Sequence, residues 1–305
     1  MAEMARNELL SKFIGSMLAA ALGDSMGAAF YKRSRDGMLR YTDDTAMMIA
    51  LAESMIENKG AIDPIKLAWK FVEIYEKEPW RGYGPGPPRI FRLIRRGEGP
   101  LELDKRFYPG GSYGNGAAMR VAPVGLFFHD DIEKLKVAVE ASCKPTHSNL
   151  LGIEGAFIEA LSVAEALKIR RDEEADPKDF IEKLIPLAST DIYRRKLMKI
   201  PELVQDGDLS KAVRELGNGV EAFNSVPTAI YCYLRGGEPL KAIELAIRLG
   251  GDRDTIACMA GAIAGAHRGS ESLPHDLLKR LENREYIMQL AKKLYELKFG
   301  GEPQR

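Results

Sequence analysis

The sequence has few cysteines and no excess of charge of either sign. Three cysteines occur among 305 residues, and none stands in a CxxC or a cysteine/histidine pattern. This scarcity argues against a disulfide framework and against a zinc centre. The 44 basic residues balance 44 acidic residues. We therefore expect no general binding of nucleic acid, which requires a basic excess.

The chain also lacks a long uninterrupted apolar run. Residues 13–30 are rich in Ala, Met and Leu, but Asp24 interrupts them, and the apolar part before it is shorter than the roughly 18 to 20 residues of a membrane span. The first twelve residues carry mixed charge rather than the positive start of a signal peptide. We predict a soluble, cytoplasmic protein that does not associate with membranes, and we expect a monomer. No segment has the composition of a linker, so residues 1–305 should form one domain.

Apolar residues recur at helical spacing along most of the chain, which predicts an all-α fold. Helices are expected over 46–56, 64–75, 90–96, 131–143, 151–169, 180–187, 189–198, 208–216, 222–234, 239–249 and 277–299. The first helix should end at Gly23, with a turn as far as Gly27. The glycine- and proline-rich segment 79–88 should be a functional loop. A strand over 121–128 is the one competing interpretation, and Pro123 and Gly125 disfavour it.

Two short segments place oxygen ligands directly before an apolar helix. The first is Thr42-Asp43-Asp44-Thr45, and the second is Asp252-Arg253-Asp254-Thr255. One explanation is ordinary capping, in which the carboxylates complement a helix dipole. The recurrence of the pattern favours another, in which both segments bind divalent cations such as Mg²⁺, Mn²⁺ or Ca²⁺.

Small residues in the helix after Thr255 indicate how the two segments meet. Its glycines, Gly261 and Gly265, weaken a helix unless another backbone approaches closely. A crowded helix crossing there would gather one set of hard ligands: Thr42, Asp43, Asp44, Asp252, Asp254 and Thr255. Four carboxylates in one pocket call for roughly two divalent cations, because unpaired buried charges are costly. Asp24 would then be either a helix cap or a partner of this cluster.

A second glycine-rich loop, 107–116, leads into the segment Ala117 to Arg120. Backbone N–H groups at the start of a helix suit a phosphate, although the loop matches neither the GxGxxG nor the P-loop pattern. A flexible turn is the equally weighted alternative. His147 lies near the start of a predicted helix, where a cap or a satisfied polar residue is more common than a ligand contact.

Taken as an ordered set, these segments resemble the ADP-ribosylglycohydrolase family. The resemblance covers nearly the whole chain. It is carried by residues 23–27, 41–47, 81–86, 111–116, 146–147 and 251–255. It implies an all-α, single-domain orthogonal helical bundle with two Mg²⁺ ions, or Mn²⁺ in their place. It also implies hydrolysis of a glycosidic bond between ADP-ribose and a protein side chain or a small acceptor.

The resemblance assigns roles to individual residues. It makes Thr42, Asp43, Asp44, Asp252, Asp254 and Thr255 the metal ligands, with Asp43, Asp44 and Asp254 catalytic. The substrate-binding residues that it implies are Tyr83, Phe107, Gly111, Ser112, Tyr113, Gly114, Asn115, Gly116 and His147. The diphosphate would follow the loop 111–116, and Phe107 and His147 would lie near the adenosine. The partners would be ADP-ribosylated proteins or ADP-ribosyl small molecules.

One position departs from the family pattern. Family members carry a glutamate a few residues after the Gly-Asp pair, whereas this chain has Tyr31. A tyrosine, with a pKa of about 10, is a poor base and a poor anionic ligand at neutral pH. Asp36 could substitute for the missing carboxylate. Otherwise the chain would be a weak or inactive protein that binds ADP-ribose, which is our alternative hypothesis. A helical protein with a purely structural metal is a third and weaker one.

Overall fold

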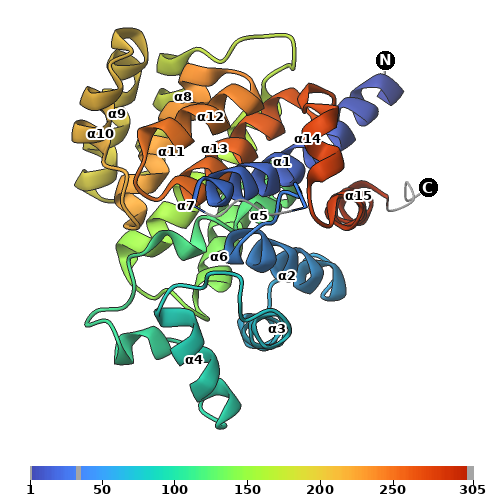
Figure 1. Cartoon of the computed structure of the whole chain (residues 1–305), viewed down its shortest axis with the longest axis vertical. Coiled ribbons are helices and arrows are strands. Elements are labelled where there is room, and N and C mark those ends of the chain that lie inside the picture. The colour runs from blue at the N-terminus through green and yellow to red at the C-terminus, as the bar shows by residue number, and fades with distance from the viewer. Residues whose placement is uncertain (1, 32–35, 301–305) are drawn as a thin grey trace.

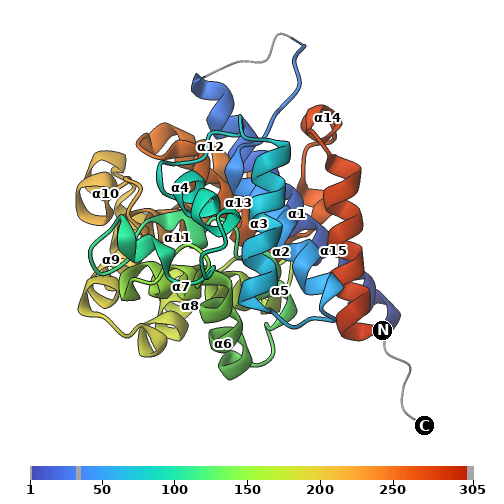
Figure 2. The same cartoon turned by 90° about the horizontal axis from the view of Figure 1, so that it is seen from below.

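The computed structural model describes residues 2–31 and 36–300, and it describes side chains for residues 6–30 and 36–300. Within this range the regular elements are helices, and the loops between them form two isolated β-bridges. The α-helices are α1 (Ala2–Tyr31), α2 (Asp43–Glu57), α3 (Pro64–Lys77), α4 (Gly86–Arg95), α5 (Ala122–Phe127), α6 (Ile132–Cys143), α7 (Leu150–Lys168), α8 (Pro177–Leu184), α9 (Asp191–Asp206), α10 (Leu209–Leu216), α11 (Ala222–Gly236), α12 (Pro239–Leu249), α13 (Arg253–Arg268), α14 (His275–Arg280) and α15 (Arg284–Phe299). The predicted all-α bundle is confirmed (Figures 1 and 2).

Helices α1 and α13 cross at the centre of the molecule with their backbones almost in contact (Figure 1). A Cβ atom added to Gly261 would lie 2.4 Å from the carbonyl oxygen of Ala19, and one added to Gly265 would lie 2.3 Å from that of Gly15. Only glycine fits at such distances, and the buried contact offsets its low helix propensity. The crowded crossing predicted from the small residues of α13 is therefore present.

Helix α1 continues past Gly23 to Tyr31, so the predicted helix end and turn at 23–27 are wrong. Gly23 and Gly27 are contact positions instead. An added Cβ would lie 2.1 Å from the carbonyl oxygen of Ala257 at Gly23, and 2.4 Å from the Cα atom of Asp254 at Gly27. The glycines of α1 and those of α13 thus serve the same crossing.

By length and composition, α1 is the one helix in the described part of the chain that could cross a membrane. Its most apolar window, within Arg6–Phe30, has a mean hydropathy of 1.3. However, 78% of that window is buried inside the protein. Because α13 and its neighbours cover this surface, the helix has the burial of a core element.

Most remaining helices lie close to their expected positions, with four differences. Helix α9 continues to Asp206, past the expected end at residue 198. Helix α4 begins at Gly86, because Pro87 and Pro88 occupy its first turn, where proline fits. Residues 122–127 form helix α5 rather than a strand. The expected helix 277–299 is divided into α14 and α15 at Asn283, which has a φ of 53°.

Candidate active site

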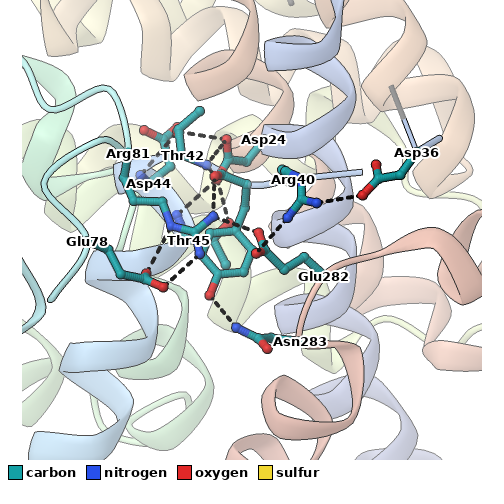
Figure 3. A network of polar contacts seen from close by, with 11 residues as sticks. Asp24, Asp36, Arg40, Thr42, Asp44, Thr45, Glu78, Arg81, Glu282 and Asn283 are labelled. Atoms are coloured by element: carbon teal, nitrogen blue, oxygen red, sulfur yellow. Dashed lines mark hydrogen bonds and ion pairs between the residues drawn. The ribbon is translucent and has the colours of Figure 1, made fainter. Parts of the chain in front are cut away.

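The N-terminus of α2 is held by a buried carboxylate from the middle of α1. Asp24 is fully buried and accepts hydrogen bonds from the hydroxyl groups of Thr42 (2.8 Å) and Thr45 (2.6 Å) and from their backbone N–H groups. Figure 3 shows these contacts converging on Asp24. Asp24 does not cap its own helix, but it accepts the N–H of Thr45 in the first turn of α2 and so caps that helix from outside. Its predicted role as a partner of a metal cluster stays a prediction.

A buried arginine fixes the same segment from the opposite side. Arg81 donates to the carbonyl oxygen of Tyr41 at 3.0 Å and forms ion pairs with Glu78 and Glu282. Its guanidinium lies 4.0 Å from the centre of the Tyr41 ring, and its own carbonyl oxygen accepts from the N–H of Asp43 at 2.8 Å. The start of α2 therefore has little freedom to move (Figure 3).

The N-terminus of α13 meets the same region of α1. Asp252 accepts a hydrogen bond from the side-chain amide of Asn115 at 2.7 Å, and Asp254 accepts one from the N–H of Thr255 at 3.1 Å. Gly27 of α1 lies against the backbone of Asp254. Helix α1 thus positions both pairs of aspartates. Its Asp24 holds the start of α2, and its Gly27 contacts the start of α13.

These carboxylates carry more negative charge than their surroundings compensate. Burial, and then repulsion from Asp24, raises the pKa of Asp43 to about 8. The same two causes raise the pKa of Asp44 well above its usual range, and its buried Oδ2 has no hydrogen-bond partner. Burial raises the pKa of Asp252 to about 6 despite the bond from Asn115. Hard oxygen donors with surplus charge are the donor set that Mg²⁺ or Mn²⁺ requires.

With their side chains in these positions, the donors do not form a closed metal cage. Among the described residues, no three histidine, cysteine, aspartate or glutamate side chains are arranged so that they would hold a metal. The residue types and their uncompensated charge fit a divalent cation, and binding would require the carboxylates to turn toward it.

The glycine-rich loop is anchored by a buried aspartate that was not among the predicted site residues. Asp104 is fully buried and accepts hydrogen bonds from the N–H groups of Ser112 and Ser148, both at 2.8 Å, and from the Ser148 hydroxyl. Gly111, with a φ of +87°, passes so close to Ser148 that an added Cβ would lie 2.3 Å from its Oγ. Asp104 therefore joins the loop 111–116 to the segment that carries His147.

The far end of this loop rests on a buried arginine and a buried histidine. Arg120 donates to the carbonyl oxygen of Gly116 at 3.0 Å and to the hydroxyl of Thr146 at 2.8 Å. A Cβ added to Gly116 would lie 2.9 Å from the His147 ring. Burial, and then the charge of Arg120, lowers the pKa of His147 to about 3, so its imidazole is neutral.

The two regions face one cavity of about 500 Å³, within the range of small-molecule sites. The α2 and α13 termini supply one part of its lining, and the glycine-rich loop with the Thr146–His147 segment supplies another. From the predicted set, the lining includes Asp43, Asp44, Gly111, Ser112, Tyr113, Gly114, Asn115, Gly116, His147, Asp252, Asp254 and Thr255. Residues more than 200 positions apart in the chain thus share a single pocket.

Comparison with known proteins identifies the family. A family model described as ADP-ribosylglycohydrolase matches residues 5–304. The chain belongs to the ADP-ribosylglycohydrolase family. It is therefore a glycosidase, an enzyme that hydrolyses glycosidic bonds.

Relatives of this glycohydrolase align over nearly their whole length. The ADP-ribosylhydrolase ARH3 of Bos taurus is 35% identical, with 94% of this chain and 93% of the relative covered. The Homo sapiens protein of the same name is also 35% identical, with 94% of each chain covered. An uncharacterized protein of Archaeoglobus fulgidus is 30% identical over 94% of this chain and 96% of its own.

A solved structure described as an ADP-ribosylglycohydrolase-related protein complex has the same fold. Its TM-score is 0.75, and the match covers 96% of this chain and 100% of the other. At 24% sequence identity, this likeness concerns the fold alone.

Three predicted site residues do not line the cavity of the glycohydrolase. The Thr42 hydroxyl is turned to Asp24. Tyr83 packs edge-on against Tyr75, with ring centres 5.0 Å apart. Phe107 packs against the core, with the Arg89 guanidinium 5.7 Å from its ring centre. Each lies behind the lining and supports segments that reach the cavity.

The predicted substitution of Asp36 for the missing glutamate has no support in the geometry. Asp36 is exposed and forms an ion pair with Arg40 at 2.6 Å. In Figure 3 it lies on the far side of Arg40 from Asp44. The side chain of Tyr31 and residues 32–35 lie outside the described residues.

Sequence reasoning missed several residues of the site. Arg120, Tyr108 and Glu221 line the cavity, and Asp104 supports it. Asp104, Arg120 and Glu221 are single residues without a repeated or clustered pattern, whereas Tyr108 lies inside the predicted glycine-rich loop 107–116. The available signals were the place of Tyr108 in that loop and the position of Arg120 directly after it.

Proposed function

We propose that this glycohydrolase uses Mg²⁺ to hydrolyse the bond between ADP-ribose and an acceptor group. The observation that carries the proposal is the pairing of two unlike regions in one cavity. One is a carboxylate cluster with raised pKa values and an unpartnered oxygen. The other is a glycine-rich loop with a neutral histidine beside it. A ligand with a diphosphate at one end and ribose hydroxyls at the other suits both.

In this proposal the diphosphate lies along Gly111 to Gly116. The backbone N–H groups of the loop neutralise part of its charge, with Ser112, Tyr113 and Asn115 as polar neighbours. His147 and the aromatic Tyr108 lie toward the adenosine. The anomeric carbon then lies toward Asp43, Asp44 and Asp254.

The proposed metal ligands are Thr42, Asp43, Asp44, Asp252, Asp254 and Thr255, around two Mg²⁺ ions or Mn²⁺. Bound there, the metal would act as a Lewis acid that orients ribose hydroxyls and lowers the pKa of a water. The support is the fit of the donor set, because hard oxygen ligands with surplus charge gain most from a small divalent cation. Thr42 would have to share its oxygen with the bond to Asp24.

The chain's own carboxylates carry the proton transfer. The bond from the anomeric carbon to the acceptor breaks as a water oxygen adds to that carbon, and the water releases a proton. Asp43 or Asp44, ionised once a cation offsets their repulsion, would accept this proton as general base, since both lie at the cavity wall. The acceptor would leave with the bonding electron pair and take up a proton from the same carboxyl group or from water. Negative charge at this position also stabilises an oxocarbenium-like transition state.

The alternative of an inactive ADP-ribose-binding protein is not favoured. Membership in an enzyme family, with relatives named ADP-ribosylhydrolase, argues for activity. The carboxylates that would be superfluous in a simple binding protein are all present at the cavity.

The proposal is tested by calorimetric titration of ADP-ribose into the protein, with Mg²⁺ and again after chelation. We expect binding that weakens at least tenfold without metal, and weakens equally in the Asp254→Asn variant with metal. Serine-linked and arginine-linked ADP-ribosyl peptides then distinguish an O-glycosidic from an N-glycosidic substrate. Equal affinity with and without Mg²⁺, together with cleavage of neither peptide, would refute the proposal.

A further inference from the structure

Arg120 is a buried cation without a carboxylate partner. Its side chain is fully buried and donates to three oxygens: the carbonyl groups of Gly116 and Ser142, both at 3.0 Å, and the hydroxyl of Thr146 at 2.8 Å. Its guanidinium lies 4.5 Å from the centre of the Phe71 ring. A guanidinium can only donate hydrogen bonds, so every oxygen that it contacts must act as an acceptor.

This constraint decides what the Thr146 hydroxyl does. The hydroxyl has one hydrogen to donate, and its oxygen already accepts from Arg120. The other contact that the structure gives it within the described residues is Nδ1 of His147 at 2.8 Å. If Nδ1 carried the proton, the oxygen would accept twice and its own hydrogen would have no acceptor in a buried site, which is costly. The hydrogen of the Thr146 hydroxyl finds an acceptor only if the hydroxyl donates to Nδ1 of His147.

A neutral imidazole that accepts at Nδ1 carries its proton at Nε2. The Nε2 atom faces the glycine-rich loop, since a Cβ added to Gly116 would lie 3.2 Å from it and one added to Gly114 would lie 3.7 Å from it. These two positions have no side chain, so a ligand lying on the loop can reach the imidazole.

We propose that Thr146, oriented by Arg120, is a positioning residue that locks His147 in the Nε2–H tautomer. His147 then offers an uncharged hydrogen-bond donor to a ligand on the glycine-rich loop. That this ligand is ADP-ribose, with a phosphate oxygen or a ring nitrogen as acceptor, rests on the proposed function. The tautomer itself does not.

The charged groups near the imidazole are consistent with this role. In the described part of the chain Arg120 is the charged group that acts on the ring, and together with burial it opposes protonation. A fixed neutral donor differs from a histidine that alternates between charged and neutral forms. It would hold the ligand with the same hydrogen bond throughout the working pH range.

The first experiment reads the tautomer directly in the ligand-free protein. The chain has four histidines, so ¹⁵N-histidine labelling gives a simple spectrum, and the His147→Asn variant assigns the signal of His147. We expect a pyrrole-type Nε2 and a pyridine-type Nδ1 in the wild-type protein. Thr146→Val should lose this single-tautomer signature, and Thr146→Ser, which keeps the hydroxyl, should retain it.

The matched control is Thr190→Val. The Thr190 hydroxyl is buried and has no hydrogen-bond partner, so the same change there should leave the His147 signal unaltered. An Nδ1–H or a protonated His147 in the wild-type protein would overturn the proposal. So would an unchanged tautomer in Thr146→Val.

The second experiment measures ADP-ribose affinity for the same variants in the presence of Mg²⁺. Losing a correctly directed donor should weaken binding by about tenfold in Thr146→Val, with recovery in Thr146→Ser. If the tautomer changes but the affinity does not, the donor does not serve this ligand and that part of the proposal fails. If the wild-type protein does not bind ADP-ribose at all, the proposed function fails, while the spectrum still decides the tautomer.

Discussion

The two parts of the cavity wall differ in how their buried charged groups are compensated. At the α2 and α13 termini, Asp43 and Asp44 are buried with raised pKa values, and an oxygen of Asp44 has no partner. At the glycine-rich loop, Asp104 and Arg120 are buried as well, yet Asp104 accepts several hydrogen bonds and Arg120 donates several. In the first region like charges are buried side by side, whereas in the second most buried polar atoms are hydrogen-bonded, although Nε of Arg120 lacks a partner.

This difference indicates what each region contributes. Buried like charges persist only where something offsets them. The carboxylates of the cluster therefore take up protons, as their raised pKa values indicate, or, in our proposal, bind a cation. A loop held by several buried hydrogen bonds keeps its shape without a ligand, which reduces the entropy lost on binding. The cluster should therefore respond strongly to metal and pH, and the loop should respond to neither.

The largest effect is expected from removing one charge of the cluster. Asp44→Asn should lower the rate of ADP-ribosyl hydrolysis by about 100-fold or more, because the carboxylate both binds metal and stabilises positive charge in the transition state. In metal-free buffer the same variant should be at least as stable as the wild-type protein, since it relieves repulsion. Turnover and melting temperature measured on one preparation check both statements.

Asp36→Asn is the matched control for this change. Asp36 is exposed and pairs with Arg40, and such surface ion pairs contribute little to the stability of a protein. Its activity should stay within about twofold of wild type. A large loss in Asp36→Asn, or wild-type turnover in Asp44→Asn, would contradict the division of the wall into these two regions.

A change on α1 should disturb the cluster from a distance. In Gly27→Ala the added methyl group would lie 2.4 Å from the Cα atom of Asp254, so α13 must shift. Overpacking of this kind costs about 1–3 kcal/mol, and moving Asp254 should lower activity by about 10- to 100-fold. Thermal unfolding and turnover measure the two effects.

Gly99→Ala serves as its control, because nothing lies within 4 Å of the added Cβ. It should leave both quantities unchanged. If Gly27→Ala were as stable and as active as Gly99→Ala, the close contact between α1 and α13 would not be what positions Asp254.

The stability of the metal-free protein should fall as pH rises. Raised carboxyl pKa values mean that the folded protein binds more protons than the unfolded chain above about pH 4. This stabilisation is complete below the unfolded pKa of about 4. It is lost as pH passes through about 6 for Asp252 and about 8 for Asp43. Saturating Mg²⁺ should remove the decline and add about 3 kcal/mol for each bound ion at 100 times its Kd.

Melting temperatures between pH 5 and pH 9, with Mg²⁺ and with chelator, measure this behaviour. Asp44→Asn should show a smaller decline than the wild-type protein in chelator. A metal-free stability that rises with pH over this interval would show that the carboxylates are compensated by other groups.

The smallest effect is expected at the glycine-rich loop. Asp104→Asn keeps one oxygen for the N–H groups of Ser112 and Ser148, which both bond Oδ2. It removes the charge, however, and puts an NH₂ group in place of Oδ1, which accepts from the Ser148 hydroxyl. ADP-ribose affinity should fall by about tenfold, and Mg²⁺-induced stabilisation should be unchanged. Asp63→Asn is the control, since Asp63 caps α3 and asparagine caps equally well. Loss of the Mg²⁺ effect in Asp104→Asn would mean that the two regions are not independent.

The fold class and the carboxylate segments could be predicted from the sequence because both depend on patterns of neighbouring residues. Helical periodicity extends through most of the chain, and Asp43-Asp44 and Asp252 to Asp254 repeat one arrangement before an apolar helix. The small residues of α13 correctly predicted a close crossing. The assignment of these aspartates as metal ligands stays a prediction.

Features that depend on a partner far away in the chain could not be predicted from the sequence. Gly23 has the sequence of a helix end, but the backbone of Ala257 makes it a contact position, and that partner lies more than 200 residues away. Asp104 and Arg120 are single residues whose importance arises from the carbonyl, hydroxyl and N–H groups that folding brings to them. Tyr83 lies in a glycine-rich segment at the cavity, but its ring packs inward.

The most direct test of the central claim is release of ADP-ribose from an ADP-ribosylated peptide. It is measured with Mg²⁺, after chelation, and after Mg²⁺ is restored. The account predicts turnover with Mg²⁺, a loss of at least 100-fold on chelation, and full recovery when metal returns. Turnover that is unaffected by complete removal of divalent metal would contradict it, because the buried carboxylates would then act without the cation that their charge requires.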